Sequence, residues 1–386
     1  MSPHASSNQP IKILDSVGPA AASSGKAGAL ITNRPPLKRG NASDKRQSLF
    51  EKSFELHESL AEELKLESFC PVQNYQVVNE LSDKTDEDRY QQQTNCAKLP
   101  LCLSNLENTH AGVELPGDAA IIDPAELTYA LFNQALARNN DSSFLKATVR
   151  GLKLVDDNQT LQRILVEPGK GDCEIDYINI EKDEPVVIAL GSWSASIEDW
   201  LGIPMPIEGV VSTSMLYNNG IPSSDIGTAL FLDSDLNGCH LELFGRKDRS
   251  LYVSGCGESD VIGTEVLRGE GRPSPEICPP NMARAAAAQK SLKKLGYKEC
   301  TPDIVQACMR PMSPDAIPVV GKILSNVYVA TGGGPWGITW GPLMGKCIES
   351  LINDDDLPIR MAPLKPQRYD TLLYRTLLNS RSPNKK

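Results

Sequence analysis

Apolar positions change their spacing along the chain, and each spacing predicts a different element. Between residues 48 and 66, apolar side chains recur at three- and four-residue steps, which predicts an amphipathic helix. Residues 185–190 and 327–331 are continuous apolar runs, typical of parallel strands covered on both faces. Between about 205 and 300, short apolar segments separated by turn residues predict an antiparallel sheet. The pattern therefore predicts an α/β protein with a parallel and an antiparallel part.

Local sequence signals at helix ends predict three further helices. At 123–126 the sequence Asp-Pro-Ala-Glu supplies a capping acid, a proline suited to the first helical position and a glutamate three residues after the cap. Residues 281–295 predict an alanine-rich helix that ends before a glycine. The Gly-Pro pair at 341–342 predicts a further helix that opens there.

Composition narrows the class of protein. The chain has 386 residues, 40% hydrophobic and 23% charged, which predicts two or three globular domains and excludes a wholly disordered or collagen-like chain. The net charge of -10 argues against a nucleic-acid partner. The basic residues between 33 and 46 form either a solvated loop or an anion-binding patch. There is neither a run of 18 apolar residues nor a secretory signal at the N-terminus, so we expect a cytoplasmic protein without a transmembrane segment.

Cysteine and histidine positions do not predict a metal site. The ten cysteines are dispersed without a Cys-x-x-Cys pair, and we expect them to be reduced thiols. His57 lies near the apolar stripe of the predicted helix at 48–66, so we expect packing or hydrogen bonding rather than catalysis.

The segment after the apolar run 327–331 can bind negative charge. The three glycines at 332–334 let a ligand approach the backbone, and the N–H groups of a following helix start point outward. An ordinary tight loop is the alternative. A Walker loop is excluded, because the stretch at 341–347 has one residue too few between its glycines and ends in Cys instead of Ser or Thr.

A short strand at 11–15 ends in Asp15, which could bind a ribose hydroxyl in a dinucleotide-binding fold. An acid at the end of a surface strand is the alternative. Such folds place a Gly-x-Gly-x-x-Gly turn about 20 residues before the acid. No glycine precedes Asp15 in the sequence. Either the fold is different, or its first strand and glycine turn are missing from the sequence as given.

Residues 310–321 resemble a family signature. They read Arg-Pro-Met-Ser-Pro-Asp-Ala-Ile-Pro-Val-Val-Gly and are similar to the Arg-Pro-x-Thr-Pro-Asp-x-x-Pro-x-x-Gly pattern of D-amino-acid-oxidase-type FAD oxidoreductases. Residues 327–346 resemble the last flavin-binding strand, loop and helix of that superfamily. Ser-Gly-Lys-Ala-Gly at 24–28 and Ala-Leu-Gly-Ser-Trp at 189–193 are similar to two further elements in the same order. The resemblance spans about 11–352.

The sequence Ser-Gly-Lys-Ala-Gly at 24–28, together with Gln-Ala-Cys at 306–308, is most similar to the fungal and plant oxidoreductase branch of the superfamily. Its fungal members include a protein connected with late-endosome-to-Golgi traffic. The resemblance thus implies a cytosolic protein that can associate peripherally with late endosomes. It leaves open a protein of little or no catalytic activity that acts in endosome-to-Golgi trafficking.

The resemblance also implies a domain division. A Rossmann-like FAD-binding domain would comprise 1–32, 121–204 and 305–353, without its first strand and glycine turn. An antiparallel-sheet substrate domain would comprise 47–120 and 205–304. Residues 354–386 would form a tail, rich in proline and charge, for which we expect loose packing.

The resemblance implies flavin contacts from residues spread along the chain. Asp15 would bind ribose, the backbone of Val149 would lie by the adenine, and a helix opening near Gly341 would face the flavin N1 and C2 carbonyl. The implied cofactor-binding residues are Asp15, Ser24, Gly25, Lys26, Ala27, Gly28, Val149, Gly191, Trp193, Gly332, Gly333, Gly334, Trp336, Gly337, Ile338 and Thr339.

The implied reaction is oxidation of a C–N bond of an amine or amino acid, with hydride transfer to FAD and reoxidation by oxygen. Arg310 could hold a substrate carboxylate or form a structural salt bridge. Lys26 could lie near flavin N5 or contact phosphate. Cys308 stands where sarcosine-oxidase relatives attach flavin covalently, or is an inert buried thiol. We expect noncovalent flavin, because Arg-Pro at 310–311 resembles the noncovalent members.

The family pattern needs a strand, a glycine turn and a helix before Asp15. We therefore expect the sequence as given to bind FAD poorly, and an upstream extension that supplies these elements to restore binding.

Overall fold

The computed structural model describes residues 9–34, 46–79, 109–155, 159–168, 176–218, 220–221, 223–269, 278–297 and 301–370. Most of the basic segment at 33–46 lies outside these residues. The strands are β1 (Lys12–Asp15), β2 (Leu30–Thr32), β3 (Cys70–Asn79), β4 (Thr109–Glu114), β5 (Ala119–Ile121), β6 (Ser143–Leu154), β7 (Leu161–Pro168), β8 (Asp176–Asn179), β9 (Val186–Ile188), β10 (Glu208–Tyr217), β11 (Thr228–Leu232), β12 (Glu242–Gly245), β13 (Leu251–Ser254), β14 (Asp260–Ile262), β15 (Ile304–Met312), β16 (Val319–Lys322) and β17 (Val327–Thr331). The helices are α1 (Ser23–Lys26), α2 (Gln47–Glu63), α4 (Pro124–Ala137), α5 (Ile197–Leu201), α6 (Thr264–Arg268), α7 (Met282–Lys294) and α8 (Gly337–Asn353), with short 3-10 turns that include η1 (Gly191–Ser196), η3 (Gly334–Trp336) and η4 (Pro366–Tyr369).

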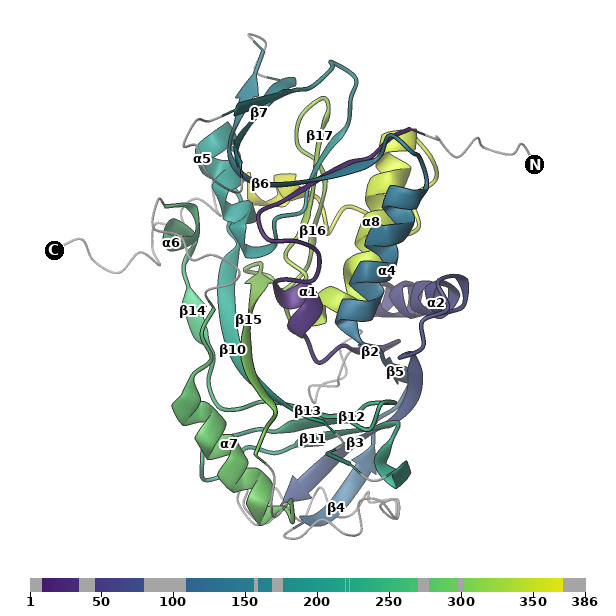
Figure 1. Cartoon of the computed structure of the whole chain (residues 1–386), viewed down its shortest axis with the longest axis vertical. Helices are drawn as coiled ribbons and strands as arrows, with labels where there is room; N and C mark the ends of the chain where they lie inside the picture. The colour runs from purple at the N-terminus through teal and green to yellow at the C-terminus, as the bar shows by residue number, and fades with distance from the viewer. Residues whose placement is uncertain are drawn as a thin grey trace, which may run out of the picture.

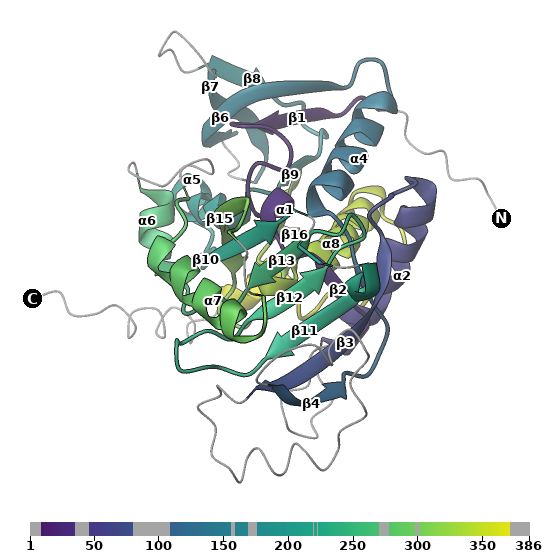
Figure 2. The same ribbon diagram turned by 60° about the horizontal axis from the view of Figure 1, so that its bottom comes forward.

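The largest sheet confirms the antiparallel part of the prediction. Its path runs β14-β10-β13-β12-β11-β3-β5-β2, and β15 and β4 pair with β10 and β3. The pairs are antiparallel except for β3 with β11. Helix α7 packs along this sheet (Figures 1 and 2), where Ala285, Ala288 and Leu292 join a core with Met215 and Val253. We call this unit the large sheet.

The predicted parallel part is divided between two smaller mixed sheets, ordered β1-β6-β7-β8 and β16-β17-β9. In each of them one pair is parallel, and the pairs β6-β7, β7-β8 and β16-β17 are antiparallel. Strand β1 is parallel to β6, and β9 is parallel to β17. Among the described strands, β1 and β9 each pair on one side. The prediction that 185–190 is covered on both faces is wrong for Val187, which is 44% exposed, whereas Ile188 is buried. One apolar cluster joins both sheets through Ala147, Ile188 and Val329.

Helix α8 begins at Gly337, so the predicted start at Gly341 is wrong. Pro342 lies inside the helix and has no N–H to donate to the Ile338 carbonyl four residues earlier. The buried His57 on α2 supplies a donor instead, with its Nε2 2.9 Å from that carbonyl oxygen. The expectation that His57 packs and forms hydrogen bonds is therefore confirmed, and its contact explains how a proline is tolerated in α8.

The predicted cap of α4 is present, with a different role for its glutamate. Asp123 Oδ1 accepts the N–H groups of Ala125 and Glu126 at 2.7 and 3.1 Å. The Glu126 carboxylate does not return to the cap; it accepts the N–H groups of Glu67 and Ser68. This contact ties α4 to the segment before β3.

The expected loose packing beyond residue 354 is wrong for the part that the structure describes, residues 354–370. Met361, Leu364 and Tyr369 are buried. Arg368 Nε lies 2.9 Å from Asp315 Oδ2, and Tyr369 donates to the same carboxylate at 2.8 Å. None of the helices in the described ranges is both long and apolar enough to cross a bilayer.

Candidate active site

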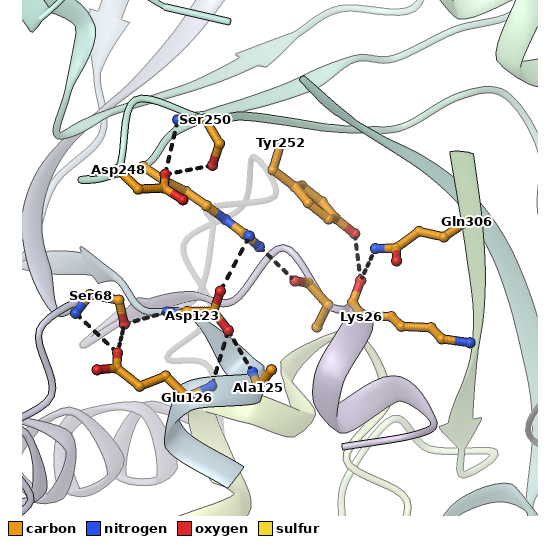
Figure 3. Close-up of polar contacts among 11 residues, drawn as sticks. Lys26, Ser68, Asp123, Ala125, Glu126, Asp248, Ser250, Tyr252 and Gln306 are labelled. Atoms are coloured by element: carbon orange, nitrogen blue, oxygen red, sulfur yellow. Dashed lines mark hydrogen bonds and ion pairs between the residues drawn. The ribbon is translucent and has the colours of Figure 1, made fainter. Parts of the chain in front are cut away.

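Loop 24–28 is held through its carbonyl groups, as Figure 3 shows. The Lys26 carbonyl accepts from Tyr252 on β13 and from Gln306 on β15, each at 3.1 Å. The Ala27 carbonyl accepts from Arg246 at 3.2 Å. Tyr252 and Gln306 belong to the large sheet. The loop is therefore fixed by the large sheet and by Arg246, which directly follows β12, and these donors come from both predicted domains.

The glycines of this loop are required by close packing. A Cβ built on Gly25 would lie 1.9 Å from the Ala20 carbonyl oxygen, and one on Gly28 would lie 2.6 Å from the Phe244 ring. No side chain fits at either distance, so the Gly-x-x-Gly spacing is explained by the packing of the loop. It is not by itself proof of a ligand contact.

Strand β15 joins three of the predicted flavin segments. It contacts α1, which contains Lys26, and the turns η1 and η3, which contain Gly191 and Gly334. Alternate residues of a strand share a face, so Gln306, Cys308, Arg310 and Met312 lie along one side. Met312 forms a bridge with Gly333. The structure thus brings loop 24–28 and the segments at 191–193 and 332–339 around a single strand.

Asp15 and Val149 lie on a different sheet from this centre, on β1 and β6. Asp15 Oδ1 accepts the N–H groups of Val17 and Gly18 at 2.8 and 2.7 Å. One carboxylate oxygen is thus engaged in the turn after β1, and the other is available to a ribose hydroxyl.

Arg310 is held by hydroxyl groups. Its terminal nitrogen donates to Ser212 and, at 3.2 Å, to Ser259, whose hydroxyls are 2.6 Å apart. No carboxylate in the described ranges pairs with it, so the structural salt bridge is not observed. Its Nε is buried without a hydrogen-bond partner. An arginine so placed favours binding of an anion.

Lys26 provides a second cation close to β15. No ion pair joins it to a carboxylate within the described segments. Burial raises the pKa of the Cys308 thiol, and the charges of Arg310 and Lys26 oppose that rise. Cys308 is therefore a buried thiol within the electrostatic influence of two cations, neither of which has a carboxylate partner in the described ranges. A covalent bond from it to flavin stays untested.

Two of the predicted flavin glycines border open space. A Cβ built on Gly191 or on Gly337 would meet nothing within 4 Å, and Gly191 adopts φ +55°. The Thr331 hydroxyl holds the Gly191 carbonyl at 2.8 Å, which ties this turn to β17. Gly333, in contrast, packs against the Gly337 Cα, where a Cβ would approach to 2.8 Å. Open space at 191 and 337, two cations without a carboxylate partner among the described residues, and the first N–H groups of α8 fit the isoalloxazine end of FAD.

The two tryptophans among the predicted residues have apolar neighbours. Trp336 packs edge-to-face on Phe50 at 5.0 Å. Trp193 packs partly against the cluster of Ala195 and Met309. These contacts fix the turns η1 and η3, so both tryptophans have a structural role whether or not they touch a ligand.

Sequence reasoning missed the side chains that hold the site together. Tyr252, Arg246, Ser212 and Ser259 were not predicted, and Gln306 was noted only within the resemblance. Their partners are more than 50 residues away in sequence, so local spacing gives no signal for them. No group of three or more His, Cys, Asp or Glu side chains in the described part of the chain could hold a metal ion.

Comparison with known proteins places this geometry in a family. The model of the FAD dependent oxidoreductase family matches residues 5–351. A Schizosaccharomyces pombe protein, named as an oxidoreductase without a stated substrate, is 26% identical over 363 residues, which cover 89% of this chain and 86% of that protein.

Solved structures share the fold at low identity. Iminodiacetate oxidase from Chelativorans sp. BNC1 superposes with a TM-score of 0.68 at 16% identity and covers 93% of both chains. Glycine oxidase from Geobacillus kaustophilus gives 0.68 at 17% identity over 93% of this chain and 92% of that one. The family match spans most of the sequence, and the fold agrees with it. The chain belongs to the family of FAD-dependent oxidoreductases.

Proposed function

We propose that the protein oxidises the C–N bond of an amine that carries a carboxylate, such as an amino acid, and that Arg310 binds this carboxylate. The observation that carries the proposal is the guanidinium group of Arg310 on β15, which lies among the predicted flavin segments and has hydroxyl partners but no carboxylate partner in the part of the chain that the structure describes. A substrate carboxylate would complete its hydrogen bonds. The names of two proteins with this fold, glycine oxidase and iminodiacetate oxidase, agree with such a substrate.

The family cofactor, FAD, supplies the acceptor for the hydride when it is bound. We propose that residues 24–28, 191–193 and 332–339 line its ring, that Asp15 binds ribose, and that the backbone of Val149 lies by the adenine. The N-terminus of α8 at Gly337 would stabilise negative charge on the ring. The predicted domain division stays part of this proposal, with β15 contributing to the large sheet and to the cofactor site.

Replacement of Arg310 tests the proposal. In a flavin-loaded preparation, Arg310→Ala should raise the KM for an amino acid about 10- to 100-fold, because a charge-assisted hydrogen bond contributes about 1.5–3 kcal/mol. The same amine without a carboxylate should show little change. Arg284→Ala is the matched control, since Arg284 forms an exposed ion pair with Asp260 at 2.8 Å.

Two results would contradict the role of Arg310. Unchanged kinetics on every carboxylate substrate would exclude substrate binding by Arg310, and loss of flavin at unchanged stability would assign Arg310 to the cofactor.

Acid precipitation of the same preparation tests whether the flavin is covalently attached. Noncovalent flavin leaves its colour in the supernatant, and colour in the pellet that disappears in Cys308→Ser would show a covalent bond.

A protein of little catalytic activity in endosome-to-Golgi trafficking is the second candidate. The edges of β1 and β9 that no described strand pairs favour it, because a dinucleotide site without a glycine turn beside these strands would bind the dinucleotide weakly. The absorbance spectrum of the purified protein separates the two candidates. Visible flavin bands support the enzyme, and a colourless protein that takes up no added FAD supports the second candidate.

A further inference from the structure

The Lys26 carbonyl receives two side-chain donors from two different strands. Tyr252 pairs with Leu216 of β10, and Gln306 pairs with Ser214 of the same strand. Positions 214 and 216 lie on one face of β10, so both donors project toward the loop from one side of the large sheet. Each is 3.1 Å from the same oxygen.

Tyr252 is itself rigidly held. Its ring stacks on Phe244 with an interplanar angle of 4°, and the Arg246 guanidinium lies 5.0 Å from the ring centroid. Burial raises the pKa of Tyr252 above its ordinary value, so the hydroxyl stays protonated and donates. The donor is therefore fixed in position and in protonation state.

The rest of the loop has separate anchors. Thr128 on α4 donates to the Ser24 carbonyl at 3.0 Å, and Arg246 donates to Ala27. The hydrogen bonds from Tyr252 and Gln306 are thus additional to the contacts that hold the rest of the loop. They are made to Lys26, the residue of the loop that has a charged side chain. Figure 3 shows that this side chain runs on from the carbonyl past Gln306, away from Asp123.

We propose that Tyr252 and Gln306 are positioning residues that fix the backbone of Lys26 and so direct its ammonium group to β15, where it and Arg310 together bind the substrate carboxylate. This inference rests on the proposed function. A carboxylate between two cations that have no other described ionic partner gains charge-assisted hydrogen bonds from both. The large sheet would thereby set the affinity for substrate through its contact with the backbone of Lys26.

A double-mutant cycle in the flavin-loaded protein tests this coupling. Tyr252→Phe and Gln306→Met should each raise the KM for an amino acid about fivefold, with kcat changed less than twofold, because each removes one hydrogen bond. In a Lys26→Met background neither should raise KM further. Tyr217→Phe, which removes another buried tyrosine hydroxyl of the large sheet, is the matched control and should leave KM unchanged.

A second measurement needs neither flavin nor substrate. In the flavin-free protein, the rate of Lys26 acetylation by acetic anhydride is measured by mass spectrometry relative to the exposed Lys290. Release of the half-buried Lys26 in Tyr252→Phe should raise this relative rate about fivefold. If Gln306→Met does not fold, Tyr252→Phe alone decides both measurements.

The outcomes separate this inference from the proposed function. An equal rise of KM in the Lys26→Met background, or an unchanged acetylation rate, would show that Tyr252 and Gln306 do not act through Lys26. Absence of turnover on every amine, with faster acetylation in Tyr252→Phe, would reject the proposed function and retain the positioning of Lys26.

Discussion

The large sheet and the two small mixed sheets differ in how completely their strands are paired. In the large sheet β10 pairs with β13, β14 and β15, and the side chains of the sheet hold the carbonyls of loop 24–28. In the parallel part β1 and β9 each pair on one side only among the described strands. The predicted flavin-ring segments are therefore fixed by many contacts, whereas β1 and β9, near the predicted dinucleotide site, each have one edge that no described strand pairs. Affinity for the cofactor and affinity for the substrate should respond to different changes in this molecule.

The largest effect should come from pairing the free edges. An extension before residue 9 that supplies a strand, a glycine turn and a helix should lower the Kd for FAD about 100- to 10,000-fold. Two charge-assisted hydrogen bonds to the pyrophosphate, each about 1.5–3 kcal/mol, account for that range. FAD titration followed by flavin fluorescence measures it. Tight binding without the extension would show that the free edges do not limit affinity.

The same comparison holds for apolar packing. Met215 is fully buried in the large sheet, and its replacement by alanine should lower the free energy of unfolding by about 2–5 kcal/mol. Val187 on β9 is 44% exposed, and its replacement by threonine should change the unfolding free energy by less than about 0.5 kcal/mol. Urea unfolding measures both. A large loss at Val187 would mean that another part of the protein covers β9.

The sequence predicts best those features whose causes are local. The cap of α4 and the apolar run of β17 follow from residues within a few positions of one another, and both are confirmed. The predicted start of α8 was wrong because His57, 281 residues before Ile338, supplies the donor that Pro342 cannot give to the Ile338 carbonyl. The contacts of Tyr252 and Gln306 with Lys26 span 226 and 280 residues, so no local pattern could indicate them.

The sequence-based site prediction has the same limit. The resemblance identified loop 24–28 and residues 332–339, which the structure places around β15. The partners of Arg310 are Ser212 and Ser259, which no motif includes. The motifs therefore indicated which backbone segments surround β15, and the fold was needed to show which side chains contact Arg310 and Lys26.

His57 should give the next largest effect. Replacement by leucine removes the donor to the Ile338 and Thr339 carbonyls and should cost about 1–3 kcal/mol of unfolding free energy, because two buried acceptors lose a partner. The mutant should also lose flavin more readily, since these carbonyls belong to the first turn of α8. Chemical unfolding at pH 7.5 measures the stability. An unchanged midpoint would mean that α8 relaxes without the contact.

The pH dependence of stability gives His57 a second signature. Burial lowers its pKa below the ordinary value of 6.5, outweighing the two backbone hydrogen bonds. Below pH 6.5 the unfolded chain therefore binds a proton that the folded protein does not, and stability falls as the pH drops further. In His57→Leu this contribution should vanish. An identical pH profile in the mutant would assign the acid sensitivity to other groups.

A smaller effect than that of His57 should come from the contact between residues 366–370 and the signature segment at 310–321. Burial alone would raise the pKa of Asp315, but hydrogen bonds and charge from Arg368, with a further bond from Tyr369, hold it below its ordinary value. The folded protein thus favours the ionised carboxylate, so this contribution is present above pH 3.8 and is lost as the pH falls through the lower folded pKa. Asp315 is partly exposed, which screens the pair, and Arg368→Met should cost about 1 kcal/mol at pH 7. The difference in unfolding free energy between the wild-type protein and Arg368→Met should therefore shrink on acidification toward pH 3. A difference that does not depend on pH would show that Arg368 stabilises this contact through its hydrogen bonds to backbone carbonyls and not through Asp315.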